Sequence, residues 1–248
     1  MLLALFLIFY SSLSWSWTIL LDPGHGGEDH GAKSKVIKHR KGRKSSRITV
    51  SEKTITLDIS KIIRKKLLSL GHSAYLTRSV DKSVSLSQRA ELAEKVKADI
   101  FVSIHVNSEK SRGPNGFETY YLDNHNDKAV RKVEGVENKD VGGEEKIVNQ
   151  ILIDLVIQRT APQSKQLSRI VHSHAIRAIK KRFRIKDRGV KPGLFYVLAL
   201  SKRPSILLEV GFLSHPKEVL KIQGPKFQER LATSIATGIH KYFLKQTR

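Results

Sequence analysis

The strongest constraint on the fold is the run DIFVSIHV at residues 99–106, in which apolar and β-branched residues follow one another almost without a break. A strand with one face in solvent would alternate, so an unbroken run is typical of a central strand that is covered on both faces. The runs TILL at 18–21 and SILLEV at 205–210 have the same character. Such strands occur mainly in parallel sheets that lie between two layers of helices.

Helical patterns alternate with these strands along the chain. Apolar residues from Ile55 to Leu70 fall on one helical face, with Ser51 in the N-cap position and Gly71 just beyond the last turn. Because strands and helices alternate without repeats or a domain boundary, the sequence predicts one α/β domain with a mostly parallel twisted sheet and helices on both faces. Further helices are expected at 86–97, 144–159, 164–182 and 226–244, further strands at 72–77, 116–122 and 195–200, and a solvated basic loop at 33–47.

The first residues, MLLALFLIFYSSLSWS, differ in composition from the rest of the chain. Their apolar stretch is too short to span a bilayer but suits the apolar centre of an export signal. An N-terminal anchor or a buried first strand is the alternative. Because a strand is expected directly afterwards, we interpret 1–16 as a signal peptide and 17–248 as the mature domain, located in the periplasm or outside the cell.

The chain carries 45 Lys and Arg against 23 Asp and Glu, a formal net charge of +22. A positive charge of this size attracts anionic polymers, anionic membranes or nucleic acid. The alternative is that the charge only keeps the protein soluble. Export and the lack of interleaved aromatic residues argue against nucleic acid. The basic segments Lys33–Arg47 and Arg169–Arg184 are therefore candidates for electrostatic contact with an anionic envelope polymer or lipid.

Four polar residues stand at the ends of expected core elements. His25 and His105 follow apolar runs, Glu52 opens a helix, and Glu209 interrupts the run ILLEV. The first three have ordinary explanations as a turn histidine, a core histidine and a glutamate favoured by the helix dipole. Glu209 is harder to explain in that way, because burying an unpaired carboxylate is costly. The chain has no cysteine, and two imidazoles with a carboxylate and water are the usual open set of a hydrolytic zinc site.

Seven stretches, in the same order along the chain, resemble the zinc-dependent N-acetylmuramoyl-L-alanine amidases that cut peptidoglycan. DPGHGG, SIHVN and LLEVGF together are a specific signal, whereas any one of them alone would be weak. The resemblance covers nearly the whole chain after the first 16 residues. The stretches are LLDPGHGGEDHGA (20–32), SEKTITLDIS (51–60), LTRSVDKSVSLSQRAELA (76–93), ADIFVSIHVNS (98–108), GFETYYL (116–122), DRGVKPGLFYVL (187–198) and PSILLEVGFLSH (204–215).

The resemblance implies a site and a reaction. His25, Glu52 and His105 would hold a zinc ion, and Glu209 would be the catalytic glutamate, acting as general base. The bond cut would be the amide between N-acetylmuramic acid and L-alanine, attacked by water whose pKa zinc lowers to roughly 7. The glycines that flank His25 would let the backbone turn sharply and come close to the metal.

The segment from about 124 to 160 resembles an insertion found in division-associated members of this family. In those proteins a helix covers the zinc cleft until a partner protein removes it, and an acidic residue of the helix can occupy the metal. Glu144 and Glu145 are the first candidates for such an autoinhibitory residue, and Glu137 is the second. The ordinary alternative is that these acids favour the start of a helix. The resemblance therefore predicts an activator protein that acts on this segment.

Three other functions remain as alternatives to the amidase. A zinc peptidase cutting within the stem peptide would use a similar site, and a free N-terminal L-alanine among the products of digested wall would distinguish the amidase from it. A non-catalytic wall-binding or activator protein would be expected to lack a ligand or the base, whereas all four positions are filled here. A basic polyanion binder is suggested by charge alone.

Overall fold

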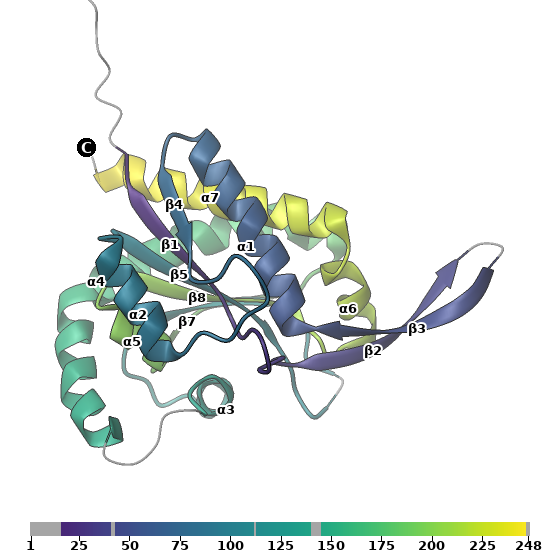
Figure 1. The fold of residues 1–248 in the computed structure, drawn as a ribbon, viewed down its shortest axis with the longest axis horizontal. Helices are drawn as coiled ribbons and strands as arrows, with labels where there is room; N and C mark the ends of the chain where they lie inside the picture. Colours follow the sequence, from purple (N-terminus) through teal and green to yellow (C-terminus); the bar gives the residue numbers. More distant parts are fainter. Residues whose placement is uncertain (1–15, 41–42, 112, 140–144, 247–248) are drawn as a thin grey trace, which may run out of the picture.

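The computed structural model describes residues 16–40, 43–111, 113–139 and 145–246. Its centre is a six-stranded sheet with the order β4-β1-β5-β8-β6-β7 (Figure 1). Neighbouring strands run parallel except β6 and β8, which are antiparallel, so the predicted mostly parallel sheet is confirmed. The strands are β1 (Thr18–Pro23), β4 (Ser73–Leu76), β5 (Ile100–Asn107), β6 (Phe117–Leu122), β7 (Asp187–Gly193) and β8 (Ser205–Phe212).

Successive residues of the central strands pack into two different apolar cores. Val102 and Leu208 belong to the first core, whereas their chain neighbours Phe101 and Leu207 belong to the second. Because side chains alternate along a strand, the two cores lie on opposite faces of the sheet. The predicted helices on both faces are therefore confirmed. Helices α1 (Glu52–Ser69), α6 (Pro216–Ile222) and α7 (Pro225–Gln246) cover the first face, and α2 (Leu86–Lys95), α3 (Lys128–Glu137) and α5 (Tyr196–Ser201) cover the second (Figure 1).

Helix α4 (Glu145–Phe183) contributes to both cores. Ile153 in its first part packs against the second core, and Leu167 in its later part packs against the first. The prediction of two helices, separated around Pro162, is wrong, because a single helix of 39 residues continues through that proline. A proline removes one helical hydrogen bond, but burial on both sides of it stabilises the continuous helix.

The basic segment predicted as a solvated loop forms a hairpin instead, so that prediction is wrong. Strands β2 (Lys33–Arg40) and β3 (Arg43–Ser51) pair antiparallel, and Figure 1 shows the hairpin projecting from the domain. Val36 and Val50 are buried against the first core and anchor its base. Because hairpin pairing uses backbone groups, the remaining positions need no apolar period, which is why the sequence pattern gave no sign of it.

The run FYVLAL was predicted to be a strand, and that prediction is also wrong. Residues Tyr196–Ser201 form helix α5, which is buried on the second face, and the edge strand β7 precedes it. A short apolar run does not distinguish a buried strand from a buried helix. The edge position of β7 tolerates Pro192 and a mixed polar sequence, so β7 carried no strand signal.

Helix α1 follows the predicted pattern and places Glu52 at its first position. Ile55, Ile59 and Leu67 are buried in the first core. Gly71 follows the helix with a φ of +84°, a conformation that favours glycine. Among the residues that the structure describes, no helix is both long and apolar enough to cross a membrane.

Candidate metal centre

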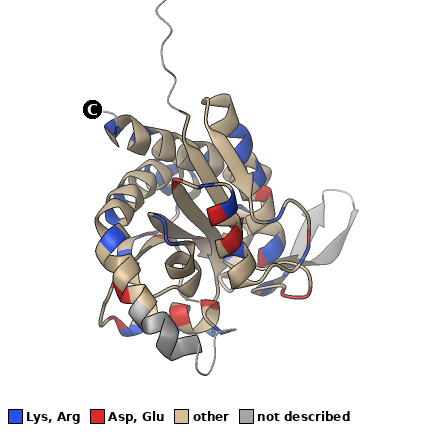
Figure 2. Cartoon of the chain, turned by 60° about the vertical axis from the view of Figure 1, so that its left-hand side comes forward, with Lys and Arg blue, Asp and Glu red and all other residues tan. Residues whose placement is uncertain are grey.

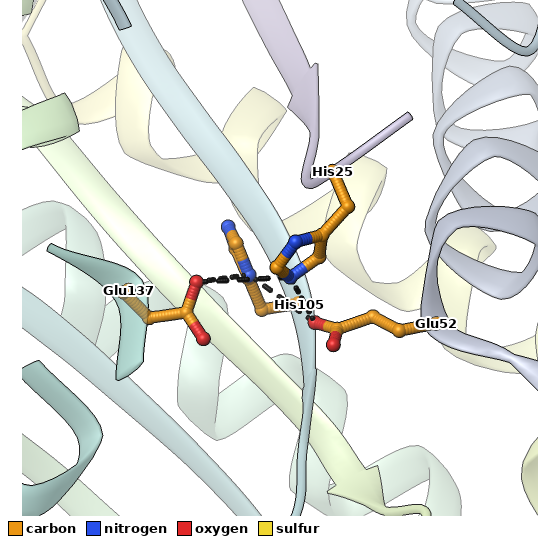
Figure 3. Close-up of side chains that lie close together, drawn as sticks. All are labelled: His25, Glu52, His105 and Glu137. Carbon is orange, nitrogen blue, oxygen red and sulfur yellow. Dashed lines mark ion pairs between the residues drawn. The ribbon is translucent and has the colours of Figure 1, made fainter. Parts of the chain in front are cut away.

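Three residues expected to bind metal come from three elements and meet where the parallel strands end. His25 follows β1, His105 lies near the end of β5, and Glu52 opens α1. Glu52 Oε1 lies 3.1 Å from His25 Nε2 and 3.2 Å from His105 Nδ1. Figure 3 shows the two imidazoles and this carboxylate pointing toward one another. All three side chains are buried, and the structure brings together the trio that the resemblance implied.

A fourth side chain, Glu137 at the end of α3, completes the cluster (Figure 3). Its Oε2 lies 2.8 Å from His105 Nδ1 and 3.8 Å from His25 Nε2. One donor atom from each of the four residues lies within 4.8 Å of the others. The sequence ranked Glu137 only second among the acids of the inserted segment. Nothing in its local pattern indicated that α3 would point this side chain at the histidines.

The first candidates from that segment are not part of the described site. Glu144 lies outside the described residues, and Glu145 begins α4 but its side chain is not among those described. The structure therefore does not test the predicted autoinhibitory role of Glu144 or Glu145. What it does describe of the segment includes α3 and the first part of α4, and both pack on the second face of the sheet with α2 and α5.

Hydrogen bonds orient two of the cluster's side chains. His25 Nδ1 donates to Asp29 Oδ2 at 2.7 Å, which leaves Nε2 facing the cluster. Glu52 accepts from the backbone N–H of Val106 and of Ala32, both at 2.8 Å. Such outer partners commonly fix metal ligands. The sequence did not identify Asp29 in this role, although its position four residues after His25 in a tight glycine turn could have suggested it.

Two ring nitrogens of the cluster fit a metal ion better than a hydrogen-bond network. His25 Nε2 and His105 Nδ1 are buried and form no hydrogen bond with any described residue, although carboxylate oxygens lie close to both. Buried nitrogen atoms in proteins are normally paired. Two imidazoles and two carboxylates form a donor set that suits zinc. The residues present therefore fit the ion that the resemblance implied.

The charges of the cluster favour its ionised forms. Burial would lower the pKa of His25, but the Glu52 carboxylate and the hydrogen bond to Asp29 raise that pKa to about 9. Burial likewise opposes ionisation of Glu52, yet the neighbouring His25 and His105 hold the pKa of this carboxyl well below its usual range. In the metal-free chain, protons therefore occupy the histidines, and a metal that binds here must displace them.

The backbone of the glycine-rich turn lies so close to the cluster that one of its positions has no room for a side chain. Gly31 has a φ of +61°, and a Cβ there would lie 2.5 Å from Glu52 Oε2 and 2.6 Å from His25 Cδ2. Any side chain would push apart two members of the cluster. His25 itself has a φ of 60°, so the turn that carries it is tightly constrained.

A buried arginine, which the sequence did not single out, joins this turn to α1. Arg78 Nε donates to the carbonyl of Pro23 at 3.0 Å, and its Nη2 donates to the carbonyls of Gly24 and Lys53, each at 2.8 Å. The guanidinium thus connects the residues before His25 with the first turn of the helix that carries Glu52. A planar group with several donors is suited to this bridging.

Glu209 lies beside the cluster in β8, where it is paired in register with His105 of β5 and Glu118 of β6. Its side chain is fully buried, and both carboxylate oxygens lack a hydrogen-bond partner among the described residues. Burial, followed by the charge of Glu137, raises the pKa of this carboxyl well above its usual range, although His105 acts in the opposite direction. The arrangement provides a carboxylate able to take up a proton next to the candidate metal site.

Comparison with known proteins places this chain in a family. A family model described as N-acetylmuramoyl-L-alanine amidase matches residues 19–241. The amidase AmiA of Escherichia coli K12 is 32% identical over 234 residues, covering 91% of this chain and 75% of AmiA. The amidase LytC of Bacillus subtilis is 30% identical, covering 91% of this chain and 35% of LytC.

Solved structures agree in fold. An N-acetylmuramoyl-L-alanine amidase from Clostridium difficile 630 matches with a TM-score of 0.68 and 30% identity, covering 93% of this chain and 98% of that protein. The CwlD amidase of Clostridioides difficile, solved in complex with the GerS lipoprotein, matches with a TM-score of 0.67 and 28% identity, covering 93% and 100%. From the site's geometry, the family model and these relatives together, we conclude that the chain belongs to the N-acetylmuramoyl-L-alanine amidase family.

Proposed function

We propose that this chain is a zinc-dependent hydrolase that cleaves the amide bond between N-acetylmuramic acid and L-alanine in peptidoglycan. Membership of the amidase family supports peptidoglycan as the substrate. The observation that carries the zinc proposal is the convergence of His25, Glu52 and His105, with buried ring nitrogens free of hydrogen bonds. These three residues would hold the ion, and when bound it would act as a Lewis acid toward water and the substrate carbonyl.

Glu209 is the proposed general base. Its unpaired carboxylate can accept a proton from the attacking water at either oxygen, because neither oxygen is engaged by a described neighbour. The same carboxyl then donates that proton to the nitrogen of the departing L-alanine as the carbon–nitrogen bond breaks. A raised pKa suits both steps, since a base poised nearer neutral pH can also serve as an acid. No covalent intermediate with the protein is required.

Glu137 is the proposed autoinhibitory residue. Its carboxylate lies among the three ligands, where a water molecule or a substrate carbonyl would have to bind. Helix α3 would then have to move before the site becomes active, which supports an activator protein acting on the segment from about 124 to 160. A related amidase has been solved with a lipoprotein bound. Glu144 and Glu145 remain further candidates for the same role.

Export to the periplasm or the exterior is part of the proposal, because peptidoglycan lies outside the cytoplasmic membrane. The support is the composition of residues 1–16. Almost all of this segment, residues 1–15, lies outside the described residues.

The function is tested with purified protein, isolated peptidoglycan and the isosteric variant Glu209→Gln. We expect close to one zinc ion per chain and new N-terminal L-alanine among the products. The variant should keep its zinc but lose turnover by about 100-fold or more. Glu218→Gln is the matched control, because Glu218 is equally buried but accepts hydrogen bonds from Gly116 and Phe212. Products that begin with another residue would indicate a peptidase, and a fully active Glu209→Gln would remove the proposed base.

The autoinhibitory role is tested separately by Glu137→Gln and by the pair Glu144→Gln and Glu145→Gln. The residue that occupies the site should, once neutralised, raise basal turnover in the absence of any partner. Basal turnover that stays at the wild-type level in every variant would reject autoinhibition and leave the amidase proposal intact.

A further inference from the structure

Charged side chains continue beyond the metal cluster in a row across the second face of the sheet. His105 in β5 is paired with Glu209 in β8, and Glu209 is paired with Glu118 in β6. Side chains at paired positions of neighbouring strands point to the same face, so these three face the same side. Tyr120, two residues after Glu118 and on that same face, is paired with Lys191 in the edge strand β7. The row therefore runs from the metal cluster past the proposed base to β7.

The row ends in two cations that share one carboxylate. Glu118 Oε2 lies 2.9 Å from Arg188 Nε and 2.6 Å from Lys191 Nζ, and its other oxygen accepts from Asn107 Nδ2 at 3.0 Å. Glu118 is only 1% exposed, whereas the side chains of Arg188 and Lys191 are 23% and 22% exposed. The single charge of Glu118 cannot neutralise both cations, so these three side chains together carry one positive charge, and both cations are partly exposed to solvent.

The two cations also have hydrogen-bonding capacity that Glu118 does not use. A guanidinium offers five N–H donors and an ammonium three. Arg188 and Lys191 each donate one hydrogen bond, to Glu118, among the described residues. Arg188 lies 5.1 Å from the ring centre of Phe212 and Lys191 5.8 Å from that of Tyr120, which limits the positions their charged ends can take.

Helix α3 of the inserted segment, which Asp127 caps, lies beside the strand that carries these cations. The pKa of Asp127, the residue that caps α3, is lowered first by the hydrogen bond from the Ala129 N–H and also by the charge of Lys191. Helix α3 also packs against β7, the strand that carries Lys191. Because Glu137 ends this helix, α3 joins β7 to the metal cluster.

The opposite end of the site has a different character. A cavity of about 440 Å³ extends from His25 and His105 toward the start of α2. Its charged members are paired with one another, as Arg89 is with Asp22 and Lys139 with Asp29. Apolar and hydroxyl side chains make up much of the remaining lining: Val84, Ser85, Leu86, Ser87, Val136, Val197 and Leu200. This end suits an uncharged sugar rather than an anion.

We propose that Arg188 and Lys191 form a carboxylate-binding subsite for the acidic stem peptide. The peptide would lie across β6 and β7 on the leaving-group side of the cut amide, and the sugar would lie toward α2. The inference rests on the proposed amidase function and adds to it the direction in which the substrate binds. Arginine and lysine suit the role, because a guanidinium can bind a carboxylate through two parallel hydrogen bonds and an ammonium adds a point charge.

The test compares two muramoyl peptides that differ at one group. Both carry L-alanine followed by a second residue. In the carboxylate peptide this second residue has a free carboxylate, and in the carboxamide peptide that group is a carboxamide. The assay uses the zinc-loaded full chain, both as wild type and as the variant Glu137→Gln. In the variant, the proposed autoinhibitory carboxylate does not limit turnover. We expect KM for the carboxylate peptide to be lower by about 10-fold or more, as charge-assisted hydrogen bonds imply, with similar kcat.

The variant Arg188→Gln with Lys191→Gln should abolish this preference by raising KM for the carboxylate peptide alone. That double variant leaves Glu118 buried without a counter-ion, which destabilises the fold. The triple variant that adds Glu118→Gln therefore removes the whole charged group. Arg203→Gln is the matched control: Arg203 is 22% exposed, pairs with Glu94 at 2.6 Å, and precedes β8 at the opposite end of the sheet. This control should keep the wild-type preference.

The released peptides provide a second readout that does not depend on turnover. Calorimetric binding of the carboxylate peptide, led by L-alanine, should weaken in the triple variant, and binding of its carboxamide counterpart should not change. Equal KM values for the two substrates in wild type, or a preference that persists in the triple variant, would overturn the subsite. Failure to hydrolyse either substrate would instead contradict the proposed amidase function.

Discussion

At the scale of single residues, the site depends on positions that have no room for a side chain. A Cβ on Gly24 would lie 2.4 Å from His105 Cε1 and 2.6 Å from its Nε2. The turn before His25 therefore packs directly against the ring of the second histidine, which comes from a different strand. A methyl group here would displace the imidazole rather than the backbone of the central sheet, because His105 has a side chain that can rotate.

Gly24→Ala is expected to weaken zinc binding by about 10-fold or more, in the range seen when the support of a metal ligand is lost. The measurement is a competition titration with a chelator of known affinity, accompanied by thermal unfolding. Gly135→Ala is the control, because no atom lies within 4 Å of the Cβ it would introduce. That change lies within α3 and should leave zinc affinity unaltered. Wild-type zinc affinity in Gly24→Ala would show that His105 does not hold the ion.

At the scale of elements, α3 is attached to the domain by side chains other than the one it places in the site. Asn138 Nδ2 donates to the carbonyl of Leu194 at 2.7 Å, and its Oδ1 accepts from the Tyr196 N–H at 3.0 Å. Glu134 accepts from the Leu194 N–H and lies 2.6 Å from His125 Nε2. The helix is thus held to the backbone that leads into α5, and it can be loosened without changing a metal ligand.

Asn138→Ala is therefore expected to raise basal amidase turnover several-fold if Glu137 blocks the site, because the end of α3 loses both of its side-chain bonds. Amide hydrogen exchange in α3 should accelerate at the same time. Asn115→Ala is the control, since the amide of Asn115 bonds only locally, to the Gly113 carbonyl. Faster hydrogen exchange in α3 without a rise in turnover would show that loosening α3 does not relieve inhibition.

At the scale of the whole molecule, the charge of +22 is spread over the surface. Figure 2 shows lysine and arginine on several of the outer helices. The later part of α4 exposes Arg177, Lys180, Lys181 and Arg182, which lie within the segment proposed to contact anionic envelope polymers. Exposed charges attract over a distance set by the salt concentration, so this contact has a simple signature.

Binding to isolated cell wall or to anionic-lipid vesicles should weaken steeply between about 0.05 M and 0.5 M NaCl, because screening shortens the reach of exposed charges. Co-sedimentation measures it, with Glu209→Gln used so that the wall is not digested. Vesicles of uncharged lipid are the control and should retain little protein at any salt concentration. Binding to wall that does not change with salt would reject the electrostatic contact.

The stability of the whole fold should also depend on buried His72, in the α1–β4 turn, which pairs with the half-buried His240 of α7. His72 Nε2 lies 2.9 Å from His240 Nδ1, and burial, followed by the charge of His240, lowers the pKa of His72. The unfolded chain therefore binds a proton at a higher pH than the folded chain does. The stability is fully present above the unfolded pKa of about 6.5 and is lost as the pH falls toward the folded pKa.

The free energy of unfolding, measured with denaturant at a series of pH values, should accordingly decrease below about pH 6.5. The pKa of His240 is lowered as well, first by burial, so His72→Gln removes one of two titrating histidines and should reduce this decrease. Its lost packing also lowers stability at neutral pH. If the free energy of unfolding decreases equally steeply below pH 6.5 in both proteins, groups other than His72 cause the loss of stability.

The sequence by itself determined those features that depend on local pattern. The unbroken apolar runs predicted β1, β5 and β8, and the helical period predicted α1, because burial on both faces or on one helical stripe leaves a direct mark on residue order. The trio His25, Glu52 and His105 was also accessible, because each residue stands at the end of such an element and belongs to a recognisable motif. Glu209 was visible as a carboxylate within an apolar run.

Only the tertiary structure decided what depends on distant neighbours. The hairpin of β2 and β3 is anchored by two valines, α4 continues through Pro162 because both sides are buried, and FYVLAL is a helix because of the space it fills. Glu137 reaches the cluster, and Arg78 joins two elements, through the placement of whole segments. Local pattern records how much of a segment is buried, whereas these outcomes depend on which partner buries it.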